Sequence, residues 1–219
     1  DEHVWRHTRR GDRYVTVIID LTPVREKRGP ARLLDMVEGR SKQVFKTWLE
    51  ERSRAWRERI EVVAMDGFTG FKTAAQEVLP DAVPVMDPFH VVQLAGDALD
   101  RTRQRVQQET LGHRGRRGDP LYGVRRSLRT GEAFLTQKQH ERLDAVFADP
   151  AHADVWRAWR VYQQVVAAYR ERFSGNGRRR LRELIDVVRA TTPAWFVELR
   201  KLGYTLERRR QDILAYFDH

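Results

Sequence analysis

Two aspartates end apolar segments of the sequence in the same way. Asp66 follows the run 62–65 and precedes a glycine, and Asp87 follows the run 83–86 and precedes a proline. A carboxylate at the end of a strand can cap the next helix. It can also bind a divalent cation, because Mg²⁺ prefers carboxylate oxygens together with water and phosphate oxygens. Each aspartate is therefore a candidate turn residue and a candidate metal ligand.

Strand and helix signals alternate in the part of the chain that precedes Asp87. The β-branched run 14–21 predicts a strand, and 31–38 predicts its antiparallel partner. Ser41 is typical of a helix cap, because apolar residues at helical spacing follow it. Further strands are predicted at 60–65 and 82–86, with a helix at 70–79 between them, and Pro84 favours a sheet edge.

If residues 1–7 end a first strand, these elements make a mixed five-stranded sheet with helices, the ribonuclease H-like arrangement. The first strand of such a sheet lies beside the fourth, which would bring Asp1 and Asp66 together. Asp20 also ends a strand. However, the chain between Leu34 and Ser41 is too short for two more strands if 14–21 is the first.

No strand signal is evident after Asp87. Pro88 suits the first turn of a helix that Asp87 would cap, and His90 would lie on that helix's face. Spacings of three and four residues predict later helices, and glycine-bearing polar runs predict loops. The helices are expected at 155–173, 181–188 and 206–217, and the loops at 112–118 and 174–177.

The charge of the chain favours a polyanionic partner. Lys and Arg number 41 against 31 Asp and Glu, which gives a net charge of +10. Nine arginines gather in one stretch with two acids: Arg101, Arg103, Arg105, Arg114, Arg116, Arg117, Arg125, Arg126 and Arg129. We expect them to contact nucleic-acid phosphates without reading bases, with the glycines of the 112–118 loop keeping part of the stretch flexible.

The composition also excludes several classes of site. The chain has no cysteine, so disulfides, cysteine zinc sites and thiol nucleophiles are excluded. No apolar run is long enough to span a bilayer, and residues 1–7 lack the apolar core of a signal peptide. A soluble intracellular protein with no membrane partner is expected.

Short motifs along the chain resemble those of the DDE transposases of the ISL-three insertion-sequence family. They are 1–2, 14–20, 63–68, 79–82, 85–92 and 118–122, followed by 128–131. The Asp-x-Phe-His segment at 87–90 is the most distinctive of them. The resemblance covers nearly all of the chain.

The resemblance implies a catalytic domain that cuts and joins transposon ends with Mg²⁺, for which Mn²⁺ can substitute. Asp1 matches the first catalytic aspartate of the family and Asp66 the second, and both would bind the metal. The implied partners are double-stranded DNA, as transposon ends and target, and further copies of the protein on that DNA. The bacterial cytoplasm, at the nucleoid, is the expected location.

Residues 1–100 would form an incomplete catalytic core, and 101–219 a basic helical insertion. The glutamate of the family normally lies in an Asn-Gly-x-x-Glu-Gly-x-Asn stretch, which this sequence lacks. The third acid is therefore expected beyond His219, and the chain alone should be inactive. Two alternatives stay open: a basic DNA-binding module without chemistry, and a ribonuclease H-like nuclease that does not join strands.

Overall fold

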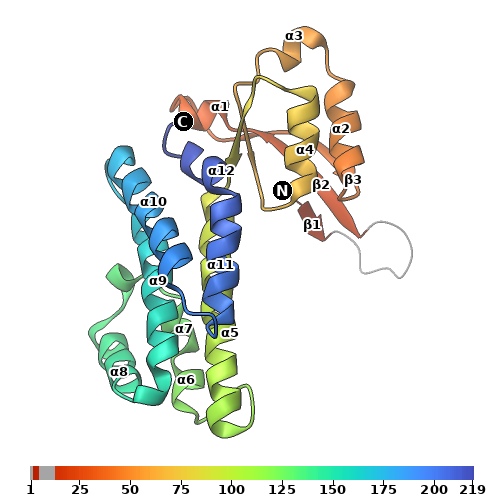
Figure 1. Ribbon diagram of the computed structural model, residues 1–219. Helices are drawn as coiled ribbons and strands as arrows, with labels where there is room; N and C mark the ends of the chain where they lie inside the picture. Colours follow the sequence, from red (N-terminus) through yellow and green to blue (C-terminus); the bar gives the residue numbers. More distant parts are fainter. Residues whose placement is uncertain (1, 5–12) are drawn as a thin grey trace. The chain divides into compact units, whose positions relative to one another are not determined.

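The computed structural model describes residues 2–4 and 13–219 of the chain. The chain divides into two compact units, Asp1–Val85 and Met86–His219 (Figure 1). The first unit is mixed α/β, and the second is helical. Asp1 lies outside the described residues.

Three strands of the first unit form an antiparallel meander. They are β1 (Glu2–Val4), β2 (Tyr14–Asp20) and β3 (Arg32–Glu38), in the order β1-β2-β3. The short helix α1 (Thr22–Arg25) and a turn join β2 to β3. The predicted pairing of the second and third of these strands is confirmed.

Two further strands, β4 (Val62–Met65) and β5 (Val83–Met86), form a separate small sheet. The amide of Val83 donates to the carbonyl of Glu61 over 2.8 Å, at the start of both strands, so the strands run in the same direction. The described residues thus form two small sheets rather than the single five-stranded sheet that we predicted. In the part of the chain that the structure describes, β1 contributes only three residues, and its ladder pairs them with β2.

Helices α2 (Lys42–Glu50) and α4 (Thr69–Val78) pack together over one face of the meander, and the shorter α3 (Arg54–Arg57) lies between them in the chain. Their buried side chains include Phe45, Trp48, Leu49 and Phe71, and Ile18 of β2 and Val37 of β3 pack against this cluster. The indole nitrogen of Trp48 also donates to Asp35 of β3 over 2.7 Å. As predicted, the Ser41 hydroxyl caps α2, accepting from the Val44 amide.

The helical unit is built around α5 (Pro88–Leu111), which packs against α9 (Ala153–Tyr169) and α11 (Val197–Arg208). The other elements are α6 (Pro120–Gly123), α7 (Arg125–Leu128), η1 (Glu132–Phe134), α8 (Gln137–Phe147), η2 (Pro150–His152), α10 (Ser174–Thr191) and α12 (Arg210–Ala215). As predicted, Asp87 caps α5 through the Phe89 amide. No helix among the described residues is both long and apolar enough to cross a membrane.

The structure corrects three boundaries in this unit. The helix predicted at 155–173 ends at Tyr169, and the one predicted at 206–217 is divided between α11 and α12 at Arg209. The segment 174–177, which we predicted to be a loop, is the first turn of α10. The Phe173 carbonyl accepts the amides of Asn176 and Gly177, and these hydrogen bonds start the helix despite the two glycines.

These two glycines give a matched pair of stability predictions. A Cβ on Gly177 would lie 2.5 Å from the Ala168 carbonyl oxygen and 2.6 Å from the Phe217 ring, whereas a Cβ on Gly175 would meet nothing within 4 Å. We expect Gly177→Ala to lower the free energy of unfolding by about 2 kcal/mol, because backbone of α9 would have to move. Gly175→Ala should be neutral or stabilising by up to about 1 kcal/mol. Urea denaturation of both variants measures the difference, and equal effects would contradict this packing.

Candidate functional site

Asp66 lies directly after β4 and is 3% exposed. One carboxylate oxygen, Oδ1, accepts the Phe68 amide over 2.8 Å. The other, Oδ2, lies 3.8 Å from Nη2 of Arg40. The Arg40 guanidinium also lies over the rings of Tyr14 and Phe68, at 5.5 and 5.2 Å from their centroids. Arg40 therefore partly neutralises the carboxylate, a neighbour that the sequence analysis did not identify.

This geometry fits the turn-residue interpretation of Asp66, since its side chain accepts the amide two residues on, just before α4 begins. The described residues contain no group of three or more His, Cys, Asp or Glu side chains that could hold a metal ion. Mg²⁺ in proteins is usually held by one or two carboxylates together with water and phosphate oxygens, and Asp66 supplies one such carboxylate. The pairing of Asp1 with Asp66 stays a prediction, because Asp1 lies outside the described part of the chain.

The other two strand-end aspartates also accept local hydrogen bonds. Asp20 accepts the Thr22 amide over 2.8 Å and an Arg32 N–H over 2.5 Å. These hydrogen bonds, with Thr22 the larger influence and Arg32 next, lower the pKa of Asp20 to about 2. Asp87 accepts the Phe89 amide over 2.8 Å. His90 lies in the first turn of α5, with its ring edge-on to Phe89.

Three of the nine predicted arginines line one shallow hollow of about 540 Å³ on the helical unit. Its walls are Arg101, Gln104, Arg105, Gln108 and Glu109 of α5, with Arg114 from the loop that follows. The α5 residues recur at spacings of three and four, so they share one face of the helix. Arg101 and Arg114 are exposed.

Arg105 is engaged by three carboxylates from three helices. It lies 2.9 Å from Glu198 of α11, 3.0 Å from Asp154 of α9 and 3.1 Å from Glu109 of α5. Burial alone would lower the pKa of this guanidinium. The hydrogen bonds that the guanidinium donates to Asp154, Glu109 and Glu198 outweigh that effect and raise its pKa above the ordinary value. Arg105 therefore connects α5, α9 and α11.

Arg103 is also used inside the protein. Its side chain is buried, pairs with Asp100 at 2.8 Å and donates to the amide oxygen of Gln107. Its spacing from Leu99 and Val106, four residues before and three after, could have revealed this, because those residues are buried on the same helical face.

The arginine-bearing loop after α5, part of which we predict to be flexible, contains two side-chain hydrogen bonds. Asp119 Oδ2 accepts the Arg116 amide over 2.5 Å, and the Gly115 amide donates to His113 Nδ1 over 3.2 Å. Gly115 has a φ of 118° and packs so closely on Gln107 that a Cβ would lie 2.7 Å from the Gln107 amide. The loop thus holds Arg114, Arg116 and Arg117 at its exposed surface.

The last three predicted arginines lie on and after α7. Arg125 lies 4.0 Å over the ring of Tyr122 and donates to the Tyr122 carbonyl over 3.0 Å. Arg129 pairs with Asp97 of α5 at 3.2 Å, and Arg126 is exposed. Seven of the nine predicted arginines are therefore exposed or half-buried without being shared among several carboxylates, whereas Arg103 is buried and Arg105 is bound by three carboxylates.

The fold defines a mixed α/β protein in which a small α/β unit is followed in the chain by a larger helical unit with an arginine-rich surface. Residues 1–219 match the family model described as "Transposase", that of the ISL-three DDE transposases, and the chain belongs to this family.

A curated relative agrees with this assignment. Over 95 residues the chain is 33% identical to the transposase for insertion sequence element IS1001 of Bordetella parapertussis. The matched stretch covers 43% of this chain and 22% of that transposase, so this chain spans much less than two thirds of the length of the relative. No solved structure matches the chain.

Proposed function

We propose that this chain is part of the catalytic core of a DDE transposase that cuts DNA at transposon ends and transfers the strands. The observation that carries the proposal is the family match over all of residues 1–219. The position of Asp66 directly after β4 supports it, because the resemblance gives this position to the second catalytic aspartate. Asp1 and Asp66 would hold Mg²⁺, or Mn²⁺ in its place, and a third acid would come from beyond His219.

Bound divalent ions would supply an activated nucleophile and charge stabilisation at the cleaved phosphodiester. The contribution of this chain is to orient Asp66, whose Oδ1 is fixed by the Phe68 amide. Arg40, 3.8 Å from Oδ2, would have to release that oxygen when a cation binds. A ribonuclease H-like sheet that joins β1 to β4 belongs to the same proposal, with 1–100 as the core and 101–219 as the insertion.

We further propose that the helical unit contacts the backbone of double-stranded DNA. The residues are the seven that are exposed or half-buried without being shared among several carboxylates: Arg101, Arg114, Arg116, Arg117, Arg125, Arg126 and Arg129. Phosphate contacts of this kind position a protein on DNA without sequence information. Arg105 would act only by holding α5 to α9 and α11, and Arg103, which is buried, would not contact DNA. Assembly of several copies on the DNA completes the proposal.

The alternative is a DNA-binding module without chemistry, and it is favoured by the burial of Asp66 and its role in a turn. A strand-transfer assay with labelled transposon-end duplexes and Mg²⁺ separates the two, using the protein that contains this chain. Joined products support the transposase, and cleaved but unjoined products indicate a nuclease. Binding without any cleavage supports the module.

A further inference from the structure

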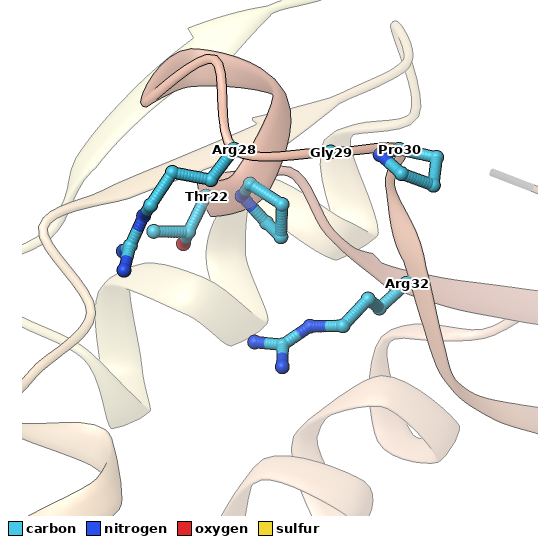
Figure 2. A pocket seen from close by; sticks show the side chains of 6 residues that line it. Thr22, Arg28, Gly29, Pro30 and Arg32 are labelled. Atoms are coloured by element: carbon cyan, nitrogen blue, oxygen red, sulfur yellow. The ribbon is translucent and has the colours of Figure 1, made fainter.

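An open hollow of about 410 Å³ lies at the connection between β2 and β3. None of the arginines proposed above to contact DNA lines it. It is lined by Thr22, Pro23, Arg28, Gly29, Pro30 and Arg32. Figure 2 shows the side chains of Arg28 and Arg32 bordering the same open space, with Thr22 beside Arg28. Two cations therefore face one cavity from opposite ends of a short turn.

The backbone of this turn is well defined. The Arg28 amide donates to the Pro23 carbonyl over 2.8 Å, and the Lys27 amide donates to the Val24 carbonyl over 3.2 Å. Lys27 has a φ of 54°, and Gly29 has a φ of 155°. Pro23 and Pro30 restrict the backbone further, because the proline ring fixes φ. The two guanidinium groups are thus carried by a preorganised frame, which lowers the entropic cost of binding a ligand.

The two cations are only partly neutralised. Arg28 pairs with Glu26, and Arg32 pairs with Asp20 at 2.5 Å. Their side chains are nevertheless 71% and 68% exposed. A guanidinium has five N–H donors, so each pairing leaves donors for a second partner. Residues 22–32 contain four basic side chains and one acid, a net charge of +3.

We propose that this hollow is a phosphate-binding site for the DNA backbone, with Arg28 and Arg32 as the two ligands. Arginine suits this task, since its planar fork can donate two hydrogen bonds to one phosphate. The inference rests on the proposed function, because it takes DNA as the polyanion, and it adds a contact in the α/β unit to those of the helical unit.

The position of the hollow predicts which phosphate it would contact. Asp66 and Arg40 lie near the Tyr14 and Gly39 end of the β2–β3 pair, where the Gly39 amide donates to the Tyr14 carbonyl. The hollow lies at the other end of the same strands. Seven strand residues span roughly 20 Å, or about six nucleotides along one DNA strand. We therefore expect a contact about six nucleotides from the cleaved bond if the DNA follows the strands.

The test measures binding of the protein that contains this chain to duplex DNA by fluorescence anisotropy, at several NaCl concentrations. The variant is Arg28→Gln with Arg32→Gln. The matched control is Arg25→Gln, which removes an exposed charge from the same turn but not from the hollow. We expect the double variant to weaken binding about tenfold and to reduce the salt slope by about 2. The control should change affinity less than about twofold.

A second variant, Asp20→Asn, distinguishes phosphate binding by Arg32 from a purely structural role of Arg32 in the turn. Asparagine keeps an oxygen for the Thr22 amide but loses the charge that holds Arg32. Releasing Arg32 should tighten DNA binding about two- to threefold. Unchanged or weaker binding by this variant would count against the site.

The outcomes separate this site from the proposed function. If the double variant binds DNA like Arg25→Gln and unfolds at the same temperature as the unaltered protein, the hollow does not bind DNA. The inference is then wrong, while the proposed function stands. If the unaltered protein does not bind duplex DNA, both proposals fall. Calorimetry with inorganic phosphate adds a third arm. Saturable phosphate binding that the double variant abolishes, without any change in DNA affinity, would identify a free-phosphate site and overturn the assignment to DNA.

Discussion

Asp66→Asn should lower the rate of DNA cleavage by about a thousandfold while leaving DNA binding nearly unchanged. If Asp66 holds the metal ion as proposed, the loss of its charge removes about 4 kcal/mol of transition-state stabilisation, which corresponds to that factor. The fold should survive, because asparagine keeps an oxygen that can accept the Phe68 amide. The measurement is Mg²⁺-dependent cleavage of a transposon-end duplex by the protein that contains this chain. Chelation of the metal with EDTA should give a comparable loss.

Asp149→Asn is the matched control for this experiment. The Asp149 carboxylate accepts the Ala151 amide over 2.9 Å, the same hydrogen bond to the amide two residues on as at Asp66, but it is exposed and precedes η2 in the helical unit. The control should cleave at the normal rate. Normal cleavage by Asp66→Asn would remove Asp66 from the mechanism. A thousandfold loss in both variants would show that the assay reports turn stability instead.

The elements that could be predicted from the sequence are those with strong local signals. β2 and β3 are runs of β-branched and apolar residues, and Ser41 and Asp87 cap the helices that we assigned to them. The division of the last helix at Arg209 was missed, because apolar residues continue at helical spacing on both sides of it. A local pattern predicts an element but does not fix its bounds where two short helices share one apolar face.

The candidate sites show a different limit of prediction from the sequence. The charge count placed all nine arginines of residues 101–129 at a DNA surface, yet Arg103 is buried and Arg105 is shared among three carboxylates. Two of those carboxylates come from helices distant in the sequence, so composition alone could not identify them. Arg28 and Arg32 are the opposite case. The charge count did not identify them, and only the folded turn reveals that they line one hollow.

Arg105→Ala should lower the free energy of unfolding of the helical unit by about 2–3 kcal/mol. The substitution leaves Asp154 and Glu198 without their shared cation, and both carboxylates are largely buried, with side chains 17% and 13% exposed. Breaking a buried ion pair costs about 3–5 kcal/mol, and the partial exposure of Arg105 reduces that figure. Chemical denaturation followed by circular dichroism measures the change.

Arg101→Ala is the matched control. We expect Arg105→Ala to change mainly the stability and Arg101→Ala to change mainly the DNA binding. Arg101 is exposed one turn earlier on α5 and lines the same hollow. Its loss should change stability by less than about 0.5 kcal/mol, but it should weaken DNA binding and reduce the salt slope by about 1. Arg105→Ala should keep that slope, because its guanidinium is occupied by carboxylates. A reduced slope with normal stability in Arg105→Ala would instead make Arg105 a DNA contact, as the charge pattern alone predicted.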